Sequence, residues 1–176
     1  YGPTAAPGFK ALVATDDQEF RLGKIKIRLL HTPGHTMESS CFLLMDESGR
    51  ETALFTGDTL FIDDVGRPEL AQKVKPDLTP EKLAALLFDS LRKKILPLPD
   101  DIIIYPAHGA GSACGKNMSN ETTDTLGHQK ATRRSSPSVM LRGEARLRGC
   151  RGITHLPPAR STSCPARTKP SSPSRG

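Results

Sequence analysis

Three short loops in this sequence carry side chains of the kinds that bind metal ions, and they lie at residues 31–36, 56–59 and 105–111. The first loop ends in His35, behind a Pro-Gly pair that forces a tight turn. The second carries Asp58 and the third carries His108. Two imidazoles and a carboxylate suit Zn(II) or Fe(II), and an ion with open coordination positions can act on a bound water, dioxygen or substrate.

Each of these side chains also has a simpler structural role open to it. A histidine at a strand end is often a surface or capping residue, and an aspartate after a glycine is often a turn former. Their shared context favours a metal site, because each loop directly follows a predicted strand. His31 is expected to support such a site through a hydrogen bond to a ligand or to the backbone. We interpret Cys114 as a small buried or loop thiol, although a soft ligand or a nucleophile is the alternative.

The elements that would position these loops can be predicted from hydrophobic patterns. Alternating charged and apolar residues predict a half-buried strand at 24–30, and apolar runs predict strands at 41–45, 52–56 and 101–105. The turn at 46–50 joins the strands at 41–45 and 52–56 into a hairpin. Thr79, Pro80 and a leucine repeat predict a helix over 79–94, and a weaker helix is predicted over about 119–130. This order predicts a layered α/β (α+β) fold whose working residues lie on loops at strand ends.

The charge of the chain is unevenly distributed. The 176 residues carry a formal net charge of +6. Residues 1–130 hold 15 Lys+Arg against 18 Asp+Glu, a net charge of −3, whereas residues 131–176 have a net charge of +9. Apolar runs fall far short of the roughly 18 residues that a membrane-spanning helix needs, so the composition excludes a transmembrane protein. Two cysteines outside the basic tail do not make a disulfide framework, so we expect a reduced, cytoplasmic setting.

The tail at 131–176 is rich in Arg, Ser and Pro and contains no Phe, Tyr or Trp, so we expect it to be disordered. It can be explained as a basic arm that contacts nucleic-acid phosphates, as a solvated terminus, or as out-of-frame translation. The absence of aromatic residues argues against nucleic-acid binding, because stacking normally contributes to it. The abrupt change from Lys to Arg favours the out-of-frame explanation.

The three loops together resemble successive motifs of the metallo-β-lactamase superfamily. The matching segments are His-Thr-Pro-Gly-His-Thr at 31–36, Phe-Thr-Gly-Asp-Thr-Leu-Phe at 55–61 and Tyr-Pro-Ala-His-Gly at 105–109. Residues 57–69 and 108–115 are similar to persulfide (sulfur) dioxygenases, close relatives of hydroxyacylglutathione hydrolases. The resemblance covers about residues 8–130 and implies most of the second half of a four-layer αββα sandwich, followed by the tail.

The resemblance also implies roles for individual residues. His35 and Asp58 would be metal ligands, and His108 matches the last family histidine, which binds the second metal in dinuclear hydrolases. Arg67 would lie near the pocket for a thiol substrate, although a solvated turn is its simpler explanation. The superfamily's His-x-His-x-Asp-His motif belongs upstream of the matched region, and this chain has no histidine before His31. We therefore expect residues 1–130 to form a partial domain, inactive as it stands, with an uncovered apolar sheet face.

The leading functional interpretation is a mononuclear Fe(II) persulfide dioxygenase that oxidises glutathione persulfide with O₂. The alternative within enzymes is a zinc-dependent thiolester hydrolase of the glyoxalase II kind, in which His108 would be a true ligand. Both take a small glutathione derivative as substrate and need no membrane. The alternative of another class is a nucleic-acid-binding protein that acts through its basic tail.

Overall fold

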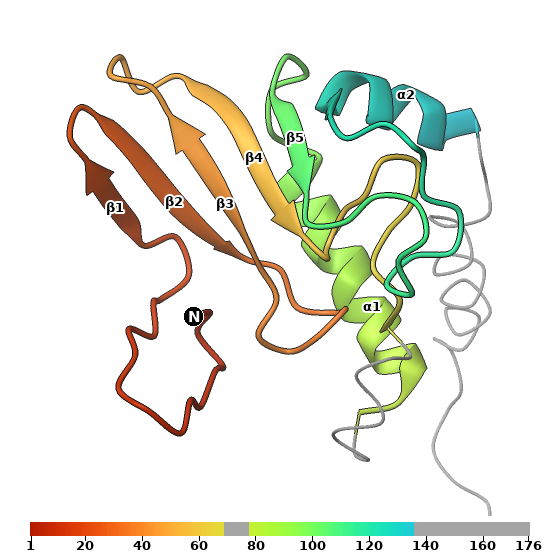
Figure 1. The fold of residues 1–176 in the computed structure, drawn as a ribbon, viewed down its shortest axis with the longest axis horizontal. Coiled ribbons are helices and arrows are strands. Elements are labelled where there is room, and N and C mark those ends of the chain that lie inside the picture. The colour runs from red at the N-terminus through yellow and green to blue at the C-terminus, as the bar shows by residue number, and fades with distance from the viewer. Residues whose placement is uncertain (69–77, 136–176) are drawn as a thin grey trace, which may run out of the picture.

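The computed structural model describes residues 1–68 and 78–135, and within them the chain forms a six-stranded sheet with helices on one side (Figure 1). The strands are β1 (Glu19–Leu22), β2 (Ile25–His31), β3 (Ser40–Met45), β4 (Glu51–Gly57), β5 (Ile103–Pro106) and β6 (Asp124–Thr125). The helices are α1 (Pro80–Ser90), a π-helical turn η2 (Leu91–Ile95) and α2 (Leu126–Ser135). The predicted α/β fold class is confirmed.

The sheet topology brings three strand ends together. Strands β1 to β4 form an antiparallel meander, whereas β5 lies parallel to β4 after the crossover through α1 and η2. Because β2 and β4 both pair antiparallel with β3, they run in the same direction, and β5 runs with them. The carboxyl ends of β2, β4 and β5 therefore meet at one end of the sheet (Figure 1). This is the end at which open α/β sheets bind ligands.

Helix α1 begins as the sequence predicts. The Thr79 hydroxyl accepts a hydrogen bond from the Lys82 N–H, and Pro80 occupies the first turn. The helix ends earlier than predicted, at Ser90, because the chain widens into the π-helical turn η2. Lys94, in that turn, forms ion pairs with Asp16 and Asp17, 2.8 and 3.0 Å away, which ties η2 to the amino-terminal segment.

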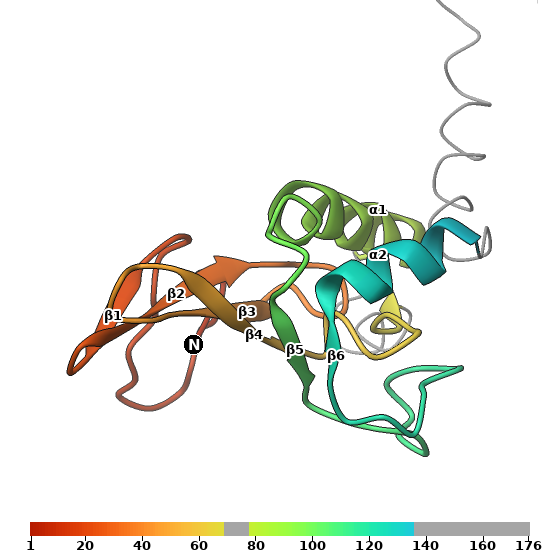
Figure 2. The ribbon, with the colours of Figure 1, turned by 90° about the horizontal axis from the view of Figure 1, so that it is seen from above.

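The hydrophobic core lies between the helices and one face of the sheet. Its members are buried apolar side chains of β2 to β5, the loop after β4, and α1, η2 and α2: Leu30, Cys41, Leu43, Leu54, Leu60, Ile62, Leu87, Leu91, Ile95, Ile102, Ile104 and Leu126. Figure 2 shows α1 and α2 on the same side of the sheet. The core therefore holds the sheet rigidly beneath the loops that leave its carboxyl end.

The opposite face of the sheet carries exposed apolar side chains, and we call Phe42, Phe55, Ile103 and Tyr105 the open face. Phe42 pairs with Phe55 across β3 and β4, and Phe55 pairs with Tyr105 across β4 and β5. The Phe55 and Tyr105 rings stack with centroids 5.4 Å apart. Each of the four side chains is about two-fifths exposed. No helix of the described residues covers them (Figure 2).

The structure differs from the sequence prediction at the edges of the fold. Edge strands β1 and β6 were not predicted, because they are short and half-polar. The second helix begins at Leu126 rather than near residue 119, and it continues to Ser135, past the predicted boundary at 130. Most of the basic tail, with the expectations of disorder and nucleic-acid contact placed on it, lies outside the described residues. Among the described residues no helix has the length and apolar character to cross a membrane.

Candidate metal centre

The structure brings His35, Asp58 and His108 together at the carboxyl end of the sheet. One oxygen of the Asp58 carboxylate, Oδ2, lies 3.5 Å from His35 Nε2. Its other oxygen, Oδ1, lies 3.2 Å from His108 Nε2. The His35 side chain is almost buried, whereas the His108 side chain is 42% exposed. Asp58 thus lies between two imidazoles that come from the loops after β2 and β5.

The spacing within this group is that of ligands to a common ion. Tetrahedral zinc with bonds of about 2.0–2.2 Å holds its nitrogen and oxygen ligands about 3.4 Å apart. A charge-assisted hydrogen bond between the same atoms would be shorter, at about 2.7–2.9 Å. Asp58 Oδ1 is buried and accepts no hydrogen bond from the described residues. A buried carboxylate oxygen without a donor is costly, so this donor set fits a bound cation.

The orientation of the His35 ring is set by a backbone carbonyl. Its Nδ1 lies 3.1 Å from the carbonyl oxygen of Arg67. Because a carbonyl can only accept a hydrogen bond, Nδ1 carries the proton and donates. In the neutral ring the other nitrogen, Nε2, presents its lone pair toward Asp58, which is the state a metal-binding histidine requires.

The loop that follows β4 can reach His35 only because residue 66 is a glycine. A Cβ on Gly66 would lie 1.9 Å from the carbonyl oxygen of Asp58 and 2.9 Å from His35 Cβ. Both distances are too short for real atoms. Gly66 therefore lets the backbone pass close to both candidate ligands.

A thiol joins the group as well. One ligand atom each from His35, Asp58 and Cys114 lie within 4.8 Å of one another. His108 is not a member of this cluster, and its Nε2 lies near the other oxygen of Asp58. The sequence interpretation of Cys114 as a small buried or loop thiol fits its half-buried place in the loop after β5, and this cluster favours the alternative, a soft ligand. The available signal was its position in the loop that also carries His108.

Arg67 contributes to the site through its peptide group. Its carbonyl accepts the hydrogen bond from His35, and its N–H donates to the carbonyl of Cys114 at 2.9 Å. Its guanidinium donates to the carbonyl of Ala113 at 3.4 Å, so the side chain lies along the loop next to the cluster. His31 lies in the same loop as His35, and its ring contacts the carbonyl of Met37 at 2.8 Å.

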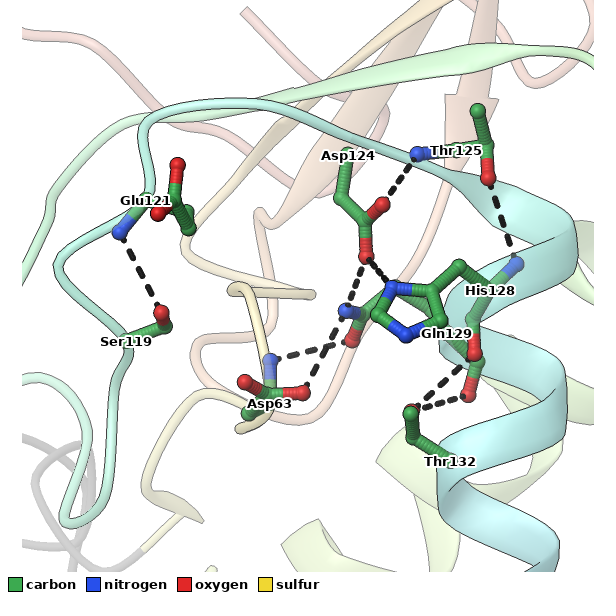
Figure 3. A network of polar contacts seen from close by, with 8 residues as sticks. All are labelled: Asp63, Ser119, Glu121, Asp124, Thr125, His128, Gln129 and Thr132. Carbon is green, nitrogen blue, oxygen red and sulfur yellow. Dashed lines mark hydrogen bonds and ion pairs between the residues drawn. The ribbon is translucent and has the colours of Figure 1, made fainter.

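Helix α2 anchors the loop that carries Asp58 (Figure 3). The buried Gln129 side chain accepts a hydrogen bond from the Asp63 N–H and donates to the Asp124 carboxylate at 2.7 Å. His128 lies 2.6 Å from the same carboxylate. Burial alone would raise the pKa of Asp124, but these contacts and the Thr125 N–H hold it below its usual range. The network fixes the loop at Asp63.

Solved structures with this fold define the class of protein. The structure superposes on a metallo-β-lactamase from Staphylococcus aureus with a TM-score of 0.63 and 36% identity, covering 84% of this chain and 41% of that one. It superposes on ETHE1 from Myxococcus xanthus with a TM-score of 0.54 and 26% identity, covering 83% of this chain and 53% of that one. No family model matches the sequence.

Curated relatives show which branch of the superfamily the chain is similar to. A probable hydroxyacylglutathione hydrolase from Schizosaccharomyces pombe is 38% identical over 54% of this chain and 32% of its own length. The human mitochondrial persulfide dioxygenase ETHE1 is 36% identical over 53% of this chain and 32% of its own length. The chain thus spans about a third of these relatives. The resemblance to the metallo-β-lactamase superfamily, in its hydroxyacylglutathione hydrolase and persulfide dioxygenase branch, is confirmed.

Proposed function

We propose that this chain carries part of the active site of a metal-dependent enzyme that acts on a glutathione-derived sulfur compound, with glutathione persulfide as substrate and Fe(II) as the metal. One observation carries the proposal. His35, Asp58 and Cys114 form a single cluster, and the exposed His108 lies outside it. A single cluster favours one ion, which is the arrangement that the resemblance to persulfide dioxygenases implies.

The residues of the chain have distinct tasks in this proposal. His35 and Asp58 hold the ion, and the Arg67 carbonyl keeps the His35 lone pair directed at it. The bound iron supplies the capacity to bind both dioxygen and a persulfide sulfur. The Arg67 guanidinium lies beside the cluster and offers a positive charge to the carboxylates of glutathione. Holding both reactants side by side supplies the proximity that the reaction needs.

A zinc-dependent thiolester hydrolase is the second candidate, and the position of His108 favours it. Its Nε2 lies 3.2 Å from the Asp58 oxygen that receives no hydrogen bond. A carboxylate with an imidazole beside each oxygen can bridge two ions, and a zinc-bound hydroxide attacks acyl carbons. Several relatives are named as hydroxyacylglutathione hydrolases, which supports this candidate.

The experiment that separates the candidates loads the protein with Fe(II) without oxygen, or with Zn(II), and measures bound metal and turnover. The few donors of this chain predict weak binding, so both metals are supplied in excess. We expect one iron per chain and, when a His-x-His-x-Asp-His segment from the family is joined upstream, O₂ consumption that depends on glutathione persulfide. His35→Ala and Asp58→Ala should remove both, while the control Glu47→Ala, in the exposed turn at the opposite end of the sheet, should retain them. Thiolester cleavage by the zinc form, lost in His108→Ala, would establish the hydrolase instead.

A further inference from the structure

Cys114 occupies a position built to present its sulfur to the cluster. Its carbonyl accepts a hydrogen bond from the Arg67 N–H, and its own N–H donates to the Ser112 hydroxyl at 3.2 Å. Just beyond it, the Asp64 carboxylate accepts hydrogen bonds from the N–H groups of Lys116 and Asn117. Asp64 is only 6% exposed, so this attachment of the loop is rigid.

Gly115 completes the attachment. A Cβ at this position would lie 2.6 Å from the Met118 side chain and 3.0 Å from the Asp64 carboxylate. The loop therefore packs closely against Met118 and Asp64 at the residue next to Cys114, and a side chain there would have to displace the Met118 side chain. The sulfur lies within 4.8 Å of the His35 and Asp58 ligand atoms. Hydrogen bonds before and after Cys114 in the loop hold it there.

Cys41 shows what a structural thiol looks like in the same protein. It is fully buried in the core, where its sulfur contacts the Thr32 hydroxyl and the Thr56 carbonyl at 3.4 Å each. Burial raises the pKa of this thiol to about 11, so it stays protonated at neutral pH. Cys114 instead is half-buried in the loop after β5, and its sulfur lies beside an imidazole and a carboxylate.

We propose that Cys114 binds the same metal ion as His35 and Asp58, as a thiolate. This inference rests on the proposed function, because it adds a ligand to the same site. On binding, the thiol gives up its proton to solvent and a metal–sulfur bond forms in its place. One neutral imidazole, one carboxylate and one thiolate then balance the two positive charges of the ion. Tetrahedral geometry spaces such a sulfur about 3.6 Å from its neighbours, which small side-chain rotations from the observed cluster achieve.

This assignment also explains how the chain gains a third protein ligand. The nitrogen, oxygen and sulfur atoms come from loops after β2, β4 and β5, so they approach an ion from three directions. Three protein ligands leave the remaining coordination positions of the ion open to substrate, dioxygen or water. The soft sulfur atom would favour transition metals over Mg²⁺ or Ca²⁺.

The test uses Co(II) as the metal and the full chain in which Cys150 and Cys164 are replaced by serine. We expect Co(II) binding to produce the near-ultraviolet absorption of a cobalt–thiolate bond. Cys114→Ser should abolish that band and weaken Co(II) binding by at least about tenfold. The matched control Cys41→Ser should keep both, since a hydroxyl can use the same two neighbours. Co(II) should also protect Cys114 from alkylation in the unmutated protein, as read by peptide mass spectrometry.

The outcomes separate this inference from the proposed function. Binding that requires His35 and Asp58 but shows no thiolate band, or a band that survives in Cys114→Ser, would overturn the thiolate ligand and leave the proposed function standing. Binding that is unchanged in His35→Ala and Asp58→Ala would overturn the proposed site itself. The alkylation readout needs no substitution, so it decides the question even where the Cys114→Ser variant folds poorly.

Discussion

At the scale of single residues, the site depends on how little space separates its parts. The Asp58 carboxylate lies within 3.5 Å of one imidazole and 3.2 Å of another. The backbone at Gly66 passes close to both Asp58 and His35. Each side chain is thus positioned by atoms that belong to another loop. A small change in one loop should therefore shift the ligand atoms on its neighbour.

The first prediction concerns Gly66→Ala. Because the added methyl group would meet the Asp58 carbonyl and His35 Cβ, one of the loops must move. We expect a loss of about 1–3 kcal/mol in the free energy of unfolding. We also expect metal affinity to fall at least about tenfold, since the two ligands would no longer share an ion. Urea unfolding and a metal titration measure the two effects.

Gly109→Ala is the control for this prediction. It lies next to His108, and a Cβ there would have no atom within 4 Å. Gly109→Ala should leave the free energy of unfolding and the metal affinity within error of the unmutated protein. If the two alanine variants behave alike, the close approach at Gly66 does not position the ligands.

The residues of the site differ in how far the sequence could reveal them. His35, Asp58 and His108 could be singled out because each follows a strand of recognisable pattern. Cys114 could be named only as an alternative ligand, and Asp64 not at all, because the loop of Cys114 is held by Asp64 through contacts between residues about fifty positions apart. The role of Arg67 was only partly visible, since sequence patterns describe side chains and its observed contacts to His35 and Cys114 are made by its peptide group.

At the scale of elements, α2 holds the loop after β4 in place, and we call the contacts of Gln129 with Asp63 and Asp124 the clamp. Gln129 is 1% exposed and connects that loop, at Asp63, to the Asp124 carboxylate at the start of the helix (Figure 3). A buried amide with several partners is costly to disturb. The clamp therefore couples the position of the loop to the charge on Asp124.

The second prediction follows from the lowered pKa of Asp124. A carboxyl group whose folded-state pKa lies below its ordinary value of 3.8 stabilises the fold above pH 3.8, and this stabilisation is lost as pH falls through the folded value. Asp124→Asn should therefore lower the free energy of unfolding by about 1–3 kcal/mol at pH 6 and by much less near pH 3. Urea unfolding of both proteins from pH 3 to 7 measures this difference.

The other carboxylates with lowered pKa values, such as Asp16 and Asp46, do not disturb this comparison. They are present in both proteins, so their contributions cancel in the difference. A difference between the two proteins that stays constant from pH 3 to 7 would show that the charge of Asp124 does not stabilise the clamp.

The elements themselves were predictable to different degrees. Strands β2 to β5 and the start of α1 follow from hydrophobic periodicity and from the Thr79-Pro80 cap. The early end of α1 could not be predicted, because the leucine repeat continues without a break into η2. The start of α2 was placed too early, since β6 forms only by pairing with the distant β5. Long-range pairing of this kind leaves little trace in a local pattern.

At the scale of the whole molecule, the sheet has one packed face and one open face. The open face carries a row of aromatic rings that pair directly across three strands. Contiguous apolar surface of this kind is rare on proteins that remain monomeric in water. The face is therefore expected to drive self-association of the chain.

The third prediction tests the open face with Phe55→Lys. The substitution places a charge at the centre of the aromatic row and removes the stacked contact with Tyr105. We expect weaker binding of a hydrophobic dye and less light scattering at a given protein concentration. Glu47→Gln, in the exposed turn between β3 and β4, changes the net charge equally and should alter neither. Equal effects of both variants would attribute the association to net charge instead of the open face.

The direction of the strands has a practical consequence. The turn at residues 46–50 joins β3 to β4 at the end of the sheet opposite the cluster. A fluorophore or a surface tether attached at Glu47 would therefore stand the length of a strand away from His35, Asp58 and Cys114. Immobilised in this way, the protein would keep its ion-binding end turned toward the solution, ready for titration by surface-based methods.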